Sequence, residues 1–178
     1  SRVVDLVHEG FDLAIRVGPL ADSALAARKL GELAYGLFAA PDYLLRRDAP
    51  SRPGDLAAHD TLAFAGGSHQ ATWKLSQDGR QERVVLQPRM KANNVFAVRD
   101  AAILGLGVAQ LPLIVATAAV RQGQLRPVLP GWSPPVVPVH AVFASARYLT
   151  PKVRGFIDLA VEAMGGEVGR LSATDHAA

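Results

Sequence analysis

The stretch 101–120 carries no charged residue, and it limits the possible folds more than any other part of the chain. A membrane-crossing helix needs about 20 apolar residues, so the length of this stretch would be sufficient for one. Gly105, Gly107, Gln110 and Pro112 interrupt it, however, and glycine and proline usually mark the ends of regular elements. The stretch therefore predicts a helix, a buried strand and a second helix within a globular domain, and not a membrane span.

Strands and helices are expected to alternate along the rest of the chain, which is typical of the α/β class. Residues 25–30 and 33–40 predict a pair of strands, and Asp78-Gly79 predicts the turn of a hairpin. Further strands are expected near 11–18, 61–64, 89–92, 108–111 and 137–144, and helices near 41–45, 95–103, 112–123 and 150–165.

The order of these elements predicts two lobes. The range 41–137 has its own β-α-β pattern and forms one lobe, and the flanking ranges 1–40 and 138–164 form the other. The chain would cross between the lobes twice, and a cleft between two hinged lobes is a usual place for a small ligand. The small and polar range 165–178 is expected to be a disordered tail.

The composition excludes several kinds of site. The chain has no cysteine, so disulfides and thiolate metal sites are excluded, and this is consistent with a cytoplasmic location. Its net charge is +3, with acidic and basic residues interspersed, and no basic block of the nucleic-acid-binding type occurs. The five histidines show no metal-ligand spacing, so we expect no metal and no cofactor.

Two glycine-containing segments superficially suggest enzymes. The segment 66–70 begins like the nucleophile elbow G-x-S-x-G, but Gln70 replaces its last glycine and the sequence places no acid–base partner. Gly105-x-Gly107 lacks the third glycine of a dinucleotide loop and follows a predicted helix instead of opening one. We therefore expect a binding protein and not an enzyme.

Six segments of the chain form a recognisable series. They are DLVHEGFDLAIRVG (5–18), PLADSALAARKLG (19–31), AAPDYL (39–44), Asp55-Leu56 with His59, GLGVAQLP (105–112) and PKVRGFID (151–158). This ordered set extends over 3–164 and resembles the effector-sensing part of LysR-type bacterial transcriptional regulators. The segment 105–112 is similar to the family's GLGIA-x-LP sequence.

The resemblance implies a fold of the periplasmic-binding-protein type II class, with a small-molecule inducer bound between two lobes and a homodimer or tetramer. It also implies a winged helix-turn-helix and a linker helix upstream, through which the full-length regulator would bind promoter DNA. Nothing in the chain matches those elements or the first strand-helix-strand of lobe one, so we expect an N-terminally truncated domain. The alternative is a solute-binding protein of a transport system, which has the same architecture.

The junction Asn93-Asn94 is the first candidate for the ligand site. Unpaired N–H groups and the positive end of the dipole at a helix start would suit a carboxylate inducer, although Asn94 could simply cap its own helix. Arg16 lies near the end of a predicted strand and could form a bidentate pair with a carboxylate, or could be an ordinary surface arginine.

Loop residues complete the predicted site. Gly18, Phe64, Gly66 and Ser68 lie at or just after the ends of predicted strands and are expected to face the same cleft, with Phe64 as an apolar wall. Each of them alone could also be a turn or core residue. The seven residues together predict a site for a carboxylate. We therefore expect a small-molecule inducer as the partner of this domain, and no membrane contact.

Overall fold

The computed structural model describes residues 11–20, 25–64, 71–144 and 149–166. The chain divides into two compact units. The middle unit is Tyr35–Pro135, and the flanking unit combines the described residues before it and after it. The two units have separate sheets and separate cores.

A five-stranded sheet forms the centre of the middle unit. Its strand order is β7 (Met90–Ala92), β4 (Thr61–Phe64), β8 (Val108–Pro112), β3 (Tyr35–Ala39) and β9 (Arg126–Val128). β4 runs parallel to both β7 and β8, whereas β3 is antiparallel to β8 and β9. β8 has four buried residues out of five, because layers cover both faces of the sheet.

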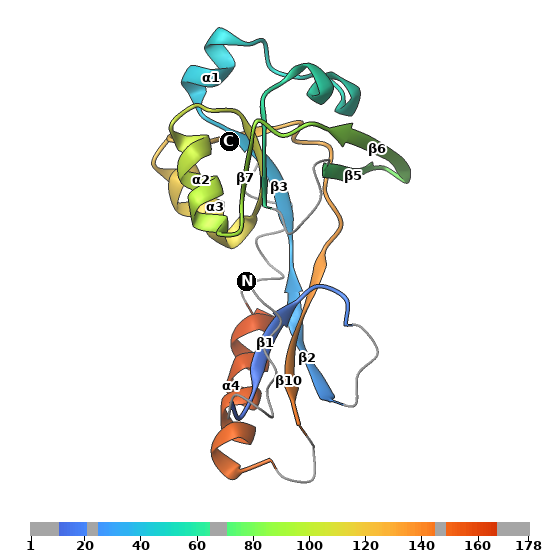
Figure 1. Ribbon diagram of the computed structural model, residues 1–178, viewed down its shortest axis with the longest axis vertical. Coiled ribbons are helices and arrows are strands. Elements are labelled where there is room, and N and C mark those ends of the chain that lie inside the picture. Colours follow the sequence, from blue (N-terminus) through green and yellow to red (C-terminus); the bar gives the residue numbers. More distant parts are fainter. Residues whose placement is uncertain (1–10, 21–24, 65–70, 145–148, 167–178) are drawn as a thin grey trace. The chain divides into compact units, whose positions relative to one another are not determined.

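Two helices cover one face of this sheet. They are α2 (Val95–Ile103) and α3 (Leu113–Arg121), and Figure 1 shows them side by side. The buried side chains of these helices pack against Phe38, Leu62 and Leu111 of the sheet in one cluster; they are Val98, Ala101, Ala102, Ala116 and Ala119. The uncharged stretch is thus the end of α2, the whole of β8 and most of α3, as predicted. None of the helices that the structure describes is long and apolar enough to span a membrane.

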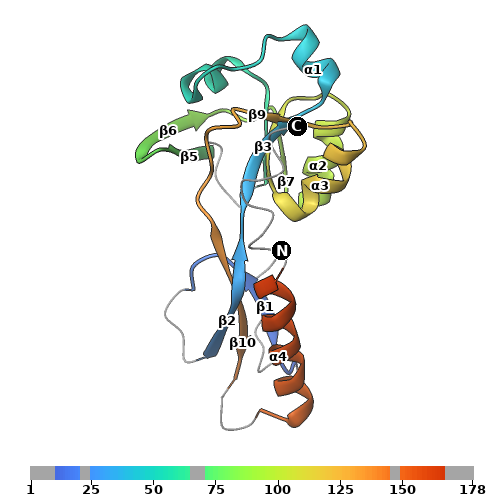
Figure 2. The same ribbon diagram turned by 180° about the vertical axis from the view of Figure 1, so that it is seen from behind.

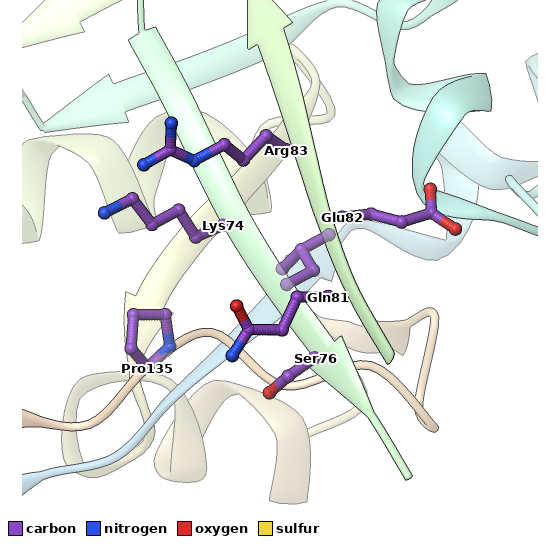
Figure 3. A pocket seen from close by; sticks show the side chains of 7 residues that line it. Lys74, Ser76, Gln81, Glu82, Arg83 and Pro135 are labelled. Atoms are coloured by element: carbon purple, nitrogen blue, oxygen red, sulfur yellow. The ribbon is translucent and has the colours of Figure 1, made fainter. Parts of the chain in front are cut away.

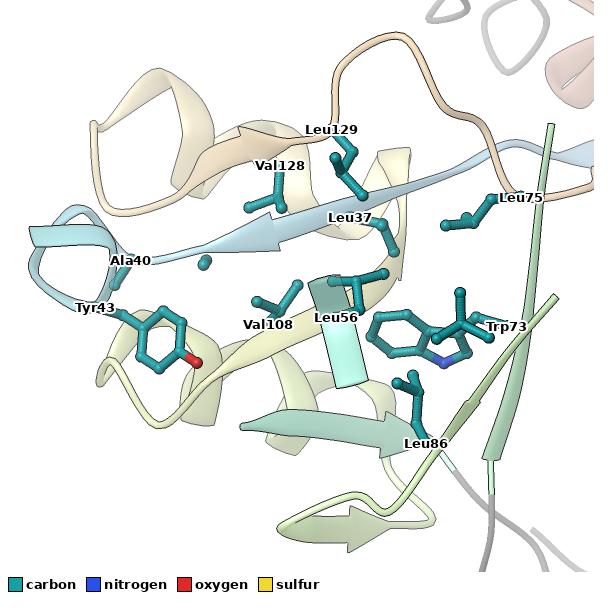
Figure 4. Packing of buried hydrophobic residues seen from close by; sticks show 12 residues of the cluster. Leu37, Ala40, Tyr43, Leu56, Trp73, Leu75, Leu86, Val108, Val128 and Leu129 are labelled. Carbon is teal, nitrogen blue, oxygen red and sulfur yellow. The ribbon is translucent and has the colours of Figure 1, made fainter. Parts of the chain in front are cut away.

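The other face is covered by a hairpin and two short helices, as Figure 2 also shows. The hairpin is β5 (Ala71–Gln77) with β6 (Arg80–Leu86), and its turn at Asp78-Gly79 has positive φ at both residues. The helices are α1 (Pro41–Arg46) and the 3-10 helix η1 (Pro53–Ala58). Figure 4 shows the indole of Trp73 beside Leu56 and Leu86, in the cluster that attaches the hairpin to the sheet.

The flanking unit is a three-stranded antiparallel sheet with one helix. β10 (Val137–Phe143) lies between β1 (Ala14–Val17) and β2 (Ala26–Leu33). The helix α4 (Pro151–Gly166) buries Val153 and Ile157 against alternate residues of β10, because these two residues lie four positions apart on one face of the helix.

One predicted strand pairing and three predicted boundaries differ from the structure. β2 and β3 do not pair with each other, because β2 pairs with β10 and β3 pairs with β8 and β9. The range 35–40 therefore belongs to the middle unit and not to the flanking lobe, and the return to the flanking unit falls at Val136 instead of 138. α4 continues through Gly166, so the predicted tail cannot begin at 165, and 167–178 lie outside the described residues.

Candidate effector site

The carboxyl ends of three parallel strands meet at one edge of the middle sheet. Phe64 at the end of β4 is in register with Ala92 at the end of β7, and β8 ends at Pro112 on the other side of β4. Asn93 and Asn94 follow β7 directly. The structure therefore brings Phe64, Asn93 and Asn94 together at the carboxyl edge of the middle sheet, and in α/β folds ligands usually bind at this edge.

Asn94 is the N-cap of α2. Its Oδ1 accepts a hydrogen bond of 2.9 Å from the backbone N–H of Phe96. This bond satisfies one of the free donors at the helix start, so Asn94 caps its own helix. Asn93 and Asn94 are both exposed, and the side-chain amide N–H groups of Asn94 do not take part in the cap.

Two exposed phenylalanines lie at the same edge. Phe64 is 55% exposed at the end of β4, and Phe96 is 53% exposed in the first turn of α2. The guanidinium of Arg99 lies 5.2 Å from the centre of the Phe96 ring and is also paired with Asp100. Exposed aromatic rings beside asparagine amides provide an apolar surface with polar donors, which is the usual composition of a small-molecule site.

Sequence analysis missed Gln110 and Tyr35 as candidate residues. Gln110 lies two residues after Val108 on β8, and its Oε1 is buried without a hydrogen-bond partner among the described residues. Tyr35 pairs with Pro112 across the sheet, and burial raises the pKa of its hydroxyl, which stays protonated. The available signal for Gln110 was a polar residue within an uncharged and mostly apolar stretch, where burial is expected. A buried acceptor without a donor is costly unless a ligand or water supplies one.

Arg16 and Gly18 belong to the flanking unit. Arg16 lies on β1 directly opposite His140 of β10 and is partly buried. Within the described ranges Arg16 has no acidic partner, and the Nδ1 of His140 is buried without a hydrogen-bond partner. Gly18 has a φ of +112°, which favours glycine, and its N–H donates a 2.9 Å hydrogen bond to the carbonyl of Pro138.

The remaining predicted site residues, Gly66 and Ser68, lie outside the described residues. The described ranges contain no group of three histidine or acidic side chains placed to bind a metal ion.

A polar cluster at the opposite edge of the sheet has a structural role. The Asp60 N–H donates to the Tyr43 hydroxyl over 3.0 Å, and that hydroxyl lies 3.1 Å from Nδ1 of His59. Burial, together with the positive charge of Arg47, lowers the pKa of His59, so Nδ1 of its neutral ring can accept a hydrogen bond from the Tyr43 hydroxyl. Asp60 precedes the amino end of β4, so this cluster joins α1 to the sheet away from the carboxyl edge.

Comparison with known protein families decides the assignment. The LysR substrate binding domain matches residues 1–165 of the chain. The chain belongs to this family. Its fold is therefore of the periplasmic-binding-protein type II class, and it is an effector-binding domain of the LysR type, as the resemblance implied.

Curated relatives support the assignment to LysR-type regulators. The LysR-type chain is 38% identical over 90% of its length to an HTH-type transcriptional regulator of Xanthomonas campestris pv. campestris, of which it covers 48%. It is 34% identical over 96% of its length to the HTH-type transcriptional regulator PtxR of Pseudomonas aeruginosa, of which it covers 55%. The chain thus spans about half the length of these relatives. Their names favour a regulator over the transport alternative and over an enzyme.

Solved structures agree with the family assignment. The regulatory domain of CrgA from Neisseria meningitidis superposes with a TM-score of 0.78 at 28% identity, over 93% of this LysR-type chain and 81% of that one. The full-length virulence activator AphB of Vibrio cholerae superposes with a TM-score of 0.77 at 29% identity, over 91% of this chain and 55% of that one.

Proposed function

We propose that this LysR-type domain binds a small carboxylate effector in the cleft between its two units and does not change it chemically. The residues proposed to contact the effector are Phe64, Gly66, Ser68, Asn93 and Asn94 from the middle unit, with Arg16 and Gly18 from the flanking unit. Binding would favour one arrangement of the units over another, and that shift would be the signal.

The proposal rests on the residues that lie together at the carboxyl edge of the middle sheet. The exposed ring of Phe64 lies at the same edge as the exposed amides of Asn93 and Asn94, and these amides can donate to a carboxylate. Arg16 adds a cation without an acidic partner in the part of the chain that the structure describes. A guanidinium can hold a carboxylate through two parallel hydrogen bonds, which would give the site its preference for anions.

The position of Asn94 allows a test that separates binding from folding. Asn94→Asp keeps a side-chain oxygen for the helix cap but replaces an amide donor with a negative charge. We expect carboxylates that stabilise the wild-type chain in a thermal-shift screen, such as benzoate, to bind the variant at least tenfold more weakly by calorimetry. Gln124→Glu adds the same charge at an exposed residue before β9 and should bind as wild type.

Two outcomes would contradict the proposal. One is equal stabilisation by a carboxylate and by its neutral amide, such as benzoate and benzamide. The other is wild-type affinity in Asn94→Asp, Arg16→Gln and Phe64→Ala, since a site that tolerates all three changes lies elsewhere.

We propose further that the domain acts within a longer, cytoplasmic regulator that forms a homodimer or tetramer and binds promoter DNA through a helix-turn-helix. The names of the relatives and their double length support this. A mobility-shift assay should show promoter binding by the longer protein and none by the 178-residue chain. Specific binding by the 178-residue chain alone would overturn the assignment of DNA binding to another segment.

A further inference from the structure

The hairpin β5–β6 carries two like charges directly opposite each other. Lys74 of β5 is the register partner of Arg83 of β6, and both side chains are exposed. Residues opposite each other in an antiparallel pair have their Cβ atoms only about 5 Å apart, and like charges there destabilise the pair. Figure 3 shows both side chains extending to the same side of the hairpin.

Neither charge is neutralised within the described part of the chain. Other cations, such as Arg28, Arg52 and Arg89, have carboxylate partners within 4.0 Å, but Lys74 and Arg83 form no ion pair there. Glu82 is the nearest acidic residue along the strand, and Figure 3 shows its side chain pointing away from both cations. Among the described residues, the two neighbouring positive charges of Lys74 and Arg83 therefore have no carboxylate partner.

The two cations line a hollow and not a flat surface. The hollow measures about 450 Å³, counting the space open to solvent, and the other residues that line it are Leu75, Ser76, Gln81, Glu82 and Pro135. Reciprocal backbone hydrogen bonds of 2.9 Å between Ser76 and Ser133 hold the segment that leads to Pro135 against β5. The hydroxyl of Ser76 is occupied by the carbonyl of Ser133, so the donors free for a ligand are Lys74, Arg83 and the amide of Gln81.

We propose that this hollow is a binding site for a small dianion, either a phosphate group or a dicarboxylate. A forked guanidinium and a point-charge ammonium side by side suit a group with two negative charges and several acceptor oxygens. Such a ligand would relieve the repulsion between Lys74 and Arg83. The site lies on the hairpin, which is a different element from the strands whose ends form the effector site, so it does not depend on the proposed function.

Amide NMR of the 178-residue chain can test the site with inorganic phosphate and succinate as probes. At constant ionic strength set with sodium chloride, we expect saturating shifts of hairpin amides with at least one dianion and not with acetate. Lys74→Gln/Arg83→Gln should weaken that binding at least tenfold. Lys152→Gln/Arg154→Gln, which removes a Lys and an Arg from exposed positions of α4, should leave it unchanged.

The variants also report on folding. Relief of the repulsion should leave the melting temperature of Lys74→Gln/Arg83→Gln, measured without dianion, at or above that of the wild type, and Lys74→Arg should retain binding. Shifts that grow without saturation in the wild type, or identical titrations in the wild type and the hairpin variant, would overturn the proposal.

Discussion

At the scale of single residues, Gly107 shows most clearly how the backbone requires a particular residue. Its φ is +156°, and a Cβ at this position would lie 2.3 Å from the backbone carbonyl oxygen of Asp60. That contact is far shorter than packing allows, and the oxygen cannot move without shifting the start of β4. We therefore expect Gly107→Ala to lower the free energy of unfolding by about 2–4 kcal/mol, measured with denaturant. Gly54→Ala is the matched control, because nothing lies within 4 Å of a Cβ there, and it should stay within about 0.5 kcal/mol of wild type. Equal stability of the two variants would show that the approach of Asp60 to Gly107 is not tight.

At the scale of elements, the start of α2 combines folding and the proposed site in two adjacent asparagines. Asn94 accepts the capping hydrogen bond from Phe96, whereas the described residues offer Asn93 no side-chain hydrogen bond. Asn94→Ala should therefore cost about 1 kcal/mol of stability, and Asn93→Ala should stay within about 0.5 kcal/mol of wild type in the same unfolding experiment. Asn94→Ser, which retains a capping oxygen, should recover most of the loss. A loss of equal size in Asn93→Ala would mean that the cap is not the source of the effect.

At the scale of the whole molecule, the described residues form clusters that do not cross from one unit to the other. Ile157 is 1% exposed in the core of the flanking unit, so Ile157→Ala should destabilise that unit by about 2–5 kcal/mol. Both tryptophans, Trp73 and Trp132, belong to the middle unit, so their fluorescence reports on that unit alone. We expect the variant to shift the unfolding midpoint followed by circular dichroism and to leave the fluorescence midpoint near its wild-type value. Leu159→Ala on the same helix, 65% exposed, should change neither. Equal shifts of both signals in Ile157→Ala would show that the units unfold as one.

The sequence by itself determined the local elements and the family. Apolar periodicity, together with glycine and proline at element ends, located β8, α2, α3 and α4 almost correctly, and Asp78-Gly79 located the β5–β6 turn. These signals could be recognised because each acts over a few neighbouring residues. The ordered segments led to the LysR family, which the match over 1–165 confirms. The ends of predicted strands also led to Phe64, Asn93 and Asn94, which remain a proposed site.

Apart from the β5–β6 hairpin, only the tertiary structure decided which strands become partners. β2 and β3 are adjacent in sequence, but each finds its hydrogen-bond partners in a different unit, because pairing depends on residues 70 or more positions away. The same reason explains why Gln110 was not predicted as a candidate residue. A buried oxygen without a donor is a property of neighbours in space, which packing creates and local sequence does not specify.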